Sequence, residues 1–153
     1  MIQQQSSVQA SPAGGPWFNL SEVATVEVSS EATGFAVESV FTPEAGGGWR
    51  ADQVGEQTLR LVFDQPTHVR LIHLSFIETE VERTQEFLLS WAGADGQLRD
   101  VARQQYTFSP GGSTRQEENY TVDLGGVYIL QLSIKPDLEP GRAVASLARW
   151  RVA

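Results

Sequence analysis

Aromatic rings and arginines placed beside turn residues are the side chains of this sequence best suited to ligand chemistry. Phe108 precedes the Gly-rich turn 109–113, and Arg115 follows it. An aromatic ring packs against the C–H face of a sugar, while a guanidinium donates hydrogen bonds to the hydroxyl groups. By this reasoning the candidate ligand-binding residues are Phe41, Arg50, Arg83, Phe108 and Arg115.

Each candidate also has an ordinary structural explanation. Phe108 would belong to the core if it ends a strand, and Arg50 would be a surface partner of Glu44 or Asp52. Only the position of each side chain in the fold decides between the two explanations.

No motif in the sequence indicates catalysis. Glu78, Glu80 and Glu82 would share one face of an extended segment, but a solvated acidic loop that blocks strand pairing explains them more simply than a carboxylate pair or cation site. The two histidines, His68 and His73, would face opposite sides of a strand, unlike a metal-binding pair. The chain has no cysteine and therefore no thiol nucleophile or thiolate metal site. We therefore predict a protein that is not an enzyme and that has no metal site and no cofactor.

The elements that must position these residues are β-strands, because apolar and polar residues alternate in eight segments. A period of two places one set of side chains on one face of a sheet. The apolar members of the segments are Val26 and Val28; Leu59, Leu61 and Phe63; Ile72, Leu74 and Phe76; Phe87, Leu89 and Trp91; Tyr106 and Phe108; Tyr120, Val122 and Leu124; Leu130, Leu132 and Ile134; and Ala148, Trp150 and Val152. Short alternating segments separated by turns indicate an antiparallel sandwich or barrel.

Turn residues divide these segments. Pro66 cannot donate a hydrogen bond to a sheet and predicts a break between two strands. The dipeptide Asp95-Gly96 predicts a tight hairpin, and Gly125-Gly126 predicts a joint between two late strands. Tryptophans 49, 91 and 150 follow the strand pattern, so we expect them in the core.

The composition indicates one globular domain behind a short tail. Residues 1–16 are rich in Gln, Ser, Gly and Pro and predict a flexible tail. Residues 17–153 are numerous enough to form a single β-sandwich domain with a buried core. No apolar run is long enough to span a membrane.

The charge balance limits the partners that we expect. Eleven basic residues against nineteen acidic ones give a formal net charge of -8, which argues against a nucleic-acid partner. The first basic residue is Arg50, so the sequence lacks the cationic start of a secretory signal. As written, the chain is expected in the cytoplasm; as a module of a larger secreted protein, it would be extracellular.

The order of the strand segments carries a resemblance to a known family. Residues 28–31 look like an opening strand, and residues 58–66 with 69–74 match a central strand, turn and next strand. Residues 87–91 followed by Asp95-Gly96, and the ending 145–152, complete the series. Because the segments occur in this order, the chain resembles the discoidin or coagulation-factor type C domain of the galactose-binding-like superfamily. The resemblance covers most of residues 18–153.

The resemblance implies an antiparallel jelly-roll β-sandwich of about eight strands whose loops at one end bind ligands. Members include family 32 carbohydrate-binding modules, lipid-binding modules and protein-interaction modules, so the fold narrows the function to binding. We expect a non-catalytic module that recognises a glycan through these loops.

One departure from the family concerns its structural calcium. The family often holds this ion with an acidic side chain in an early loop, near Glu38 here, and a Glu in the final strand. Arg149 stands at the second of these positions, and a guanidinium repels a cation instead of coordinating it. We expect Arg149 to replace the ion by pairing with Glu38 or a neighbouring carboxylate.

A second, shorter resemblance supports an alternative function. Residues 49–51 with 54–58 are similar to a stretch in the N-terminal domain of the eukaryotic scaffold for single-strand-break repair, which shares the superfamily fold. The alternative is an intracellular adaptor that binds another protein. An exposed apolar patch on a sheet face would favour the adaptor, and a concave cleft at the loop end would favour the glycan module.

Overall fold

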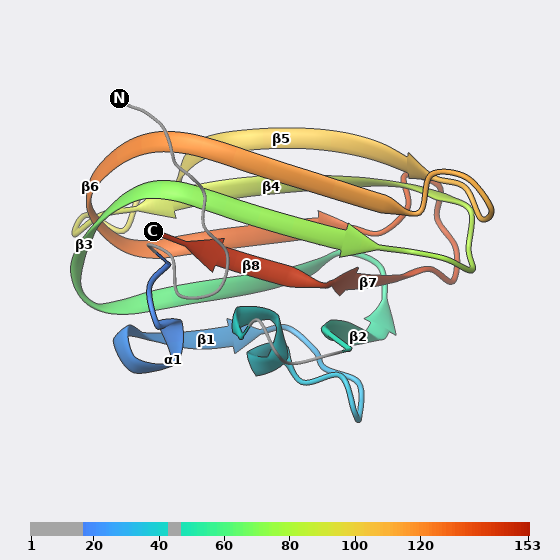
Figure 1. Cartoon of the computed structure of the whole chain (residues 1–153), viewed down its shortest axis with the longest axis horizontal. Coiled ribbons are helices and arrows are strands. Elements are labelled where there is room, and N and C mark those ends of the chain that lie inside the picture. The colour runs from blue at the N-terminus through green and yellow to red at the C-terminus, as the bar shows by residue number, and fades with distance from the viewer. Residues whose placement is uncertain (1–16, 43–46) are drawn as a thin grey trace.

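The structure, a computed structural model, describes residues 17–42 and 47–153, which form the all-β fold that the alternation predicts. The elements are α1 (Leu20–Val23), β1 (Ala24–Val28), the 3-10 helix η1 (Val37–Phe41), β2 (Trp49–Val54), β3 (Gln57–Ile77), β4 (Arg83–Ala92), β5 (Arg99–Phe108), β6 (Arg115–Lys135), β7 (Val144–Leu147) and β8 (Arg149–Val152) (Figure 1). The predicted tail, residues 1–16, lies outside the described residues. Among the residues described, no helix has the length and apolar character needed to cross a membrane.

Two long strands, β3 and β6, form the antiparallel ladder on which the sandwich is built. Residues 57–62 of β3 pair with residues 129–134 of β6, and residues 69–77 pair with residues 115–124. The register shifts between these two halves, where both strands curve over together (Figure 1). Each long strand therefore contributes to both layers of the sandwich.

The remaining strands extend the two layers. One layer has the order β1, β3, β6, β4 and β5, using the first half of β3 and the second half of β6. The other layer has the order β8, β3 and β6. In it, the second half of β3 pairs with β8 on one side and with the first half of β6 on the other. β2 and β7 form a separate two-stranded sheet. The arrangement confirms an antiparallel β-sandwich of eight strands.

The residues expected to separate strands lie instead at the bend of the long ladder. β3 continues through Pro66, and β6 continues through Gly125 and Gly126. Gly126 has a φ of +70°, a backbone conformation that side chains disfavour and that helps β6 to turn from one layer into the other. The predicted breaks are therefore wrong, because the ladder bends there without ending. The hairpin predicted at Asp95-Gly96 is confirmed between β4 and β5.

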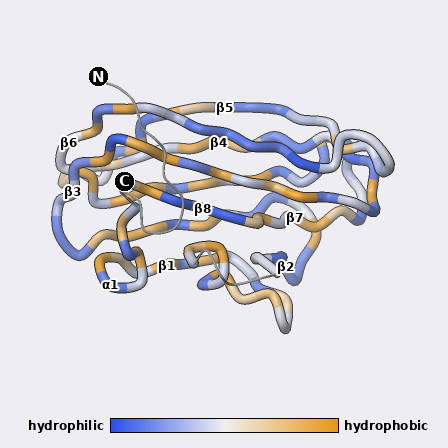
Figure 2. The backbone as a smooth tube through the Cα atoms, viewed as in Figure 1, coloured by the Kyte–Doolittle hydropathy of each residue, from blue (hydrophilic) through white to orange (hydrophobic). Residues whose placement is uncertain are grey.

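The core lies between the two layers and is made by the inward set of each alternating strand. Figure 2 shows apolar and polar residues following one another along the strands. Trp49 and Trp150 are buried as expected, together with Phe76 and Phe87, whose rings stack at 5.2 Å. Trp91 packs against this core but stays partly exposed.

The two ends of the described chain meet at one end of the sandwich. The backbone N–H of Phe18 donates to the carbonyl of Val152 at 2.8 Å. This end carries α1 and the C terminus and lies away from β2 (Figure 1).

Candidate ligand-binding site

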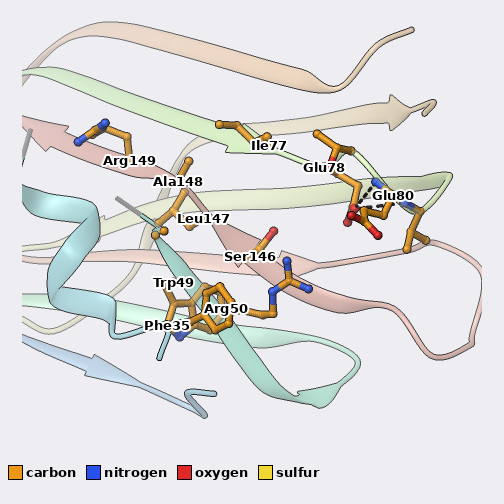
Figure 3. A pocket seen from close by; sticks show the side chains of 14 residues that line it. Phe35, Trp49, Arg50, Ile77, Glu78, Glu80, Ser146, Leu147, Ala148 and Arg149 are labelled. Atoms are coloured by element: carbon orange, nitrogen blue, oxygen red, sulfur yellow. Dashed lines mark hydrogen bonds between the residues drawn. The ribbon is translucent and has the colours of Figure 1, made fainter. Parts of the chain in front are cut away.

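A cleft of about 690 Å³ opens between β2, the loop that joins β3 to β4, and the junction of β7 with β8. This volume lies in the range of sites that bind small ligands. Its principal lining residues are Phe35 and Arg50 on one wall, Ile77, Glu78 and Glu80 on the opposite wall, and residues 146–149 between them (Figure 3).

The first wall is held close to β7 by a glycine. Trp49 pairs with Leu147, and Arg50 pairs with Ser146. A Cβ on Gly48 would lie 2.5 Å from the carbonyl oxygen of Leu147, closer than such atoms approach, and Gly48 has a φ of +68°. Only glycine lets the chain enter β2 at this distance, so Gly48 fixes the position of Arg50.

Arg50 lies over the ring of Phe35, with its Cζ atom 5.1 Å from the ring centroid. The Arg50 side chain is exposed, and the ring is partly buried. Within residues 17–42 and 47–153 no carboxylate, Asp52 included, forms an ion pair with Arg50. Glu44, the other partner suggested by the sequence, lies outside the described residues. The guanidinium is thus available to a ligand in the cleft.

The opposite wall is folded around the carboxylate of Glu78. Its oxygens accept the backbone N–H groups of Glu80 at 3.1 Å and Val81 at 3.2 Å, and Nε of Arg83 at 2.9 Å. Burial alone raises the pKa of Glu78, but these hydrogen bonds and the charge of Arg83 together lower the pKa below its ordinary value. The carboxylate is therefore charged at neutral pH and holds the loop in place.

Arg83 lies behind this wall, in the protein interior. The residue is 3% exposed, and its guanidinium donates to the carbonyl of Pro136 at 2.9 Å and to Gln85 at 3.3 Å. Its Cζ atom is 4.9 Å from the ring centroid of Phe108, which is fully buried. Both residues were predicted to contact a ligand, but strand alternation turns them inward, where a ligand cannot reach them.

The interior polar groups continue from Arg83 across the sandwich. Gln85 on β4 donates to Gln116 on β6 at 2.8 Å, and Gln116 donates to Glu118 at 2.8 Å. Tyr120 donates to the other oxygen of Glu118 at 3.2 Å; burial, the charge of Glu118 and this hydrogen bond raise the pKa of Tyr120. These groups satisfy one another, so the chain of contacts joins the two layers and has a structural role.

The other two candidates lie elsewhere. Phe41 is partly buried, with its ring 5.9 Å from that of Trp150, and lines a smaller hollow of about 270 Å³ beside Trp17. Arg115 is exposed at the start of β6 and donates to Glu117 at 2.8 Å. Of the five candidates, the structure places only Arg50 in the larger cleft.

Sequence reasoning missed Phe35. It follows Gly34 in the segment between β1 and η1, which has no strand or helix periodicity. The sequence feature that could have indicated Phe35 as a binding residue is its place beside a glycine in an irregular segment. The same feature indicated Phe108, which is buried.

The expected calcium position does not fit a divalent cation. Nη1 of Arg149 donates to the carbonyl of Thr42, at the C-terminal end of η1, at 2.7 Å. A carbonyl of this kind is a calcium ligand in oxygen-rich sites, but here it faces a guanidinium. In the part of the chain that the structure describes, no group of three or more His, Cys, Asp or Glu residues is arranged to hold a metal.

No protein-family model and no curated protein matches the chain. Solved structures do match its fold. A family 32 carbohydrate-binding module of NanJ from C. perfringens, in complex with galactose, has a TM-score of 0.64 and 16% identity, and the match covers 89% of this chain and 96% of that chain. The fold is that of the family 32 carbohydrate-binding modules.

Two further structures agree. The family 32 module of AlyQ, in complex with 4,5-unsaturated mannuronic acid, has a TM-score of 0.63 and 14% identity, with 86% of this chain and 95% of that chain covered. A pectin-binding carbohydrate-binding module has a TM-score of 0.60 and 14% identity, with 85% and 89% covered. The resemblance read from the sequence is thereby confirmed at the level of the fold.

Proposed function

We propose that this protein is a non-catalytic carbohydrate-binding module and that the cleft lined by Phe35 and Arg50 is its binding site. The observation that carries the proposal is the exposed guanidinium of Arg50 over the Phe35 ring, inside a concave site of ligand size. Two modules of the same fold are complexes with galactose and with unsaturated mannuronic acid, and a third is a pectin-binding module. These neighbours support a glycan as the ligand class. The sequence is compatible with a cytoplasmic or an extracellular location, and a carbohydrate-binding function fits the extracellular one.

The carboxylates of the cleft support binding without catalysis. Glycoside hydrolysis uses two carboxyl groups, one of them with a raised pKa so that it can donate a proton. The carboxylate of Glu78 is bonded to Arg83 and has a lowered pKa, the opposite of what a general acid needs. Incubation of the protein with any glycan that it binds should therefore release no product.

A glycan array probed with the whole protein, displayed as a tetramer, tests the proposal. Multivalent display is needed because a small open site binds weakly, with a Kd on the order of millimolar. A hit would then be titrated with Arg50→Met, expected to bind at least about tenfold more weakly. Arg103→Met is the matched control, since Arg103 is an exposed arginine on β5 with only a long 3.8 Å ion pair to Glu86.

The outcome also decides between the two hypotheses drawn from the sequence. Binding of a glycan that Arg50→Met weakens and Arg103→Met leaves intact supports the module. If no glycan binds at millimolar concentration in the array or in solution, the proposal is wrong, and the adaptor becomes the hypothesis to pursue.

A further inference from the structure

The cleft presents a cation where a sugar-stacking site would present a bare ring. The guanidinium of Arg50 lies over Phe35, so the planar group offered to a ligand is the guanidinium. Such a group has five N–H donors in a fixed fork, which matches the two oxygens of a carboxylate. Contact with the ring keeps the fork in one plane, and a preorganised fork loses less entropy on binding.

The carboxylate of Glu78, on the wall opposite Arg50, is compensated within the protein. The ionisable lining residues are Arg50, Arg149, Glu78 and Glu80. Glu78 is neutralised from behind by the buried Arg83, with 2.9 Å between Nε and Oε1. Among the described lining residues, the carboxylate of Glu80 is then the remaining negative charge near Arg50, and the case for an anion rests on the exposed donor fork of Arg50.

The wall opposite Arg50 is apolar at its rim. Ile77 is 40% exposed and Val81 is 47% exposed, and both line the cleft. Exposed apolar side chains in a concave site pack against the C–H face of a ligand. The cleft thus combines a carboxylate-binding fork on one wall with an apolar surface on the other.

We propose that the ligand is an acidic sugar of the uronic-acid class, with its carboxylate on the guanidinium of Arg50 and its C–H face against Ile77 and Val81. This inference rests on the proposed function, because it names the class of glycan that the same cleft binds. The net charge of -8 repels a long polyanion, so the favoured ligand is a short oligouronate or the end of a chain.

The experiment compares three trisaccharides in one buffer by NMR titration of the whole protein. The probes are trigalacturonate, its methyl ester and neutral galactotriose. The ester keeps the sugar ring and removes the negative charge, so it isolates the contribution of the carboxylate. Trigalacturonate should bind at least about tenfold more tightly than its ester and than galactotriose. Arg50→Met should abolish this preference, and Arg50→Lys should retain only part of it, because an ammonium cannot make the bidentate contact.

Arg103→Met and the thermal unfolding curve of each variant show whether a loss of binding reflects the cleft or the fold. Arg103→Met should leave all three affinities unchanged. Equal binding of the ester and the acid, or a preference for the acid that survives Arg50→Met, overturns the inference and leaves the proposed glycan function standing. Absence of binding to these probes and to every glycan of the array overturns both.

Discussion

Two arginines of this protein lie over phenylalanine rings at nearly equal distances, and their surroundings are opposite. Arg83 is 4.9 Å from the ring centroid of Phe108 in the interior, where its other donors meet protein acceptors. Arg50 is 5.1 Å from the ring centroid of Phe35 on the wall of a cleft, where it is exposed. The same pair of residue types therefore serves two purposes.

The difference shows that burial decides the role of a guanidinium. A buried guanidinium is tolerated only when its donors are hydrogen-bonded and its charge is compensated, and Arg83 meets both conditions. Because its N–H groups donate to protein acceptors, Arg83 has no donor directed at a ligand. An exposed guanidinium keeps its donors hydrated, and a ligand can replace the water. Stability should depend on the first arginine and binding on the second.

Removal of the buried arginine should have the largest effect. Arg83→Met leaves the carboxylate of Glu78 without its cation. Breaking a buried pair costs about 3–5 kcal/mol, and because Glu78 is only partly buried, the loss should lie at the lower end of this range. We expect a loss of that size in the free energy of unfolding, measured by urea denaturation. The same measurement on Arg103→Met should show a change of less than about 1 kcal/mol, as for other surface pairs. Equal losses in the two variants would contradict the contrast drawn here.

The pair between Arg83 and Glu78 should also make stability depend on pH. The pKa of Glu78 is lowered in the folded protein, so the unfolded state takes up the proton first as the pH falls. The stabilisation is complete above the ordinary carboxyl pKa and is lost as the pH falls through the lower folded pKa. Glu78→Gln should flatten this acid part of the stability profile, measured by thermal unfolding between neutral and strongly acidic pH. An unchanged slope would show that other carboxylates account for it.

Arg149 is the intermediate case, because it lines the cleft and also serves the fold. Arg149→Met loses a charged hydrogen bond to the carbonyl of Thr42, with an expected cost of about 1–2 kcal/mol. Because the guanidinium already occupies the carbonyl of Thr42, calcium or a chelator should not shift the melting temperature of the unmodified protein. A rise in melting temperature with micromolar calcium would show that a cation binds in spite of Arg149.

The exposed arginine should have the smallest effect on stability. A cation–π contact at an exposed site contributes about 0.5–1 kcal/mol, so Arg50→Met should unfold within about 1 kcal/mol of the unmodified protein. Calorimetric melting of the variant checks this. A loss as large as that of Arg83→Met would mean that Arg50 is structural, and the contrast between the two pairs would fail.

The fold was predictable because the alternation of apolar and polar residues is strong in most strands. Leu59 and Leu61, or Leu130 and Leu132, have no other plausible arrangement than one face of a sheet. The continuity of β3 and β6 was not predictable in the same way. Pro66 and Gly126 mark a change of direction, and a single sequence does not distinguish a bend within a strand from a turn between two strands.

The site was less predictable, because apolar residues define the strand pattern and a charged residue within a strand is ordinarily exposed. Arg83 and Gln85 occupy the same alternating set as Phe87 and Leu89, which already indicated an inward arginine. The acceptors that make such burial tolerable come from distant positions, such as the carbonyl of Pro136, and no local signal reveals them. Phe35 was missed for the related reason that its partner, Arg50, is brought near it only by the fold.

The contact between Phe18 and Val152 has a practical consequence for binding assays. Because residues 18 and 152 meet on the side away from β2, a tether attached at residue 17 or at residue 153 directs the cleft outward. A protein immobilised on a sensor surface through one end or the other should present the same face to solution. Parallel measurements in the two orientations should then give one dissociation constant.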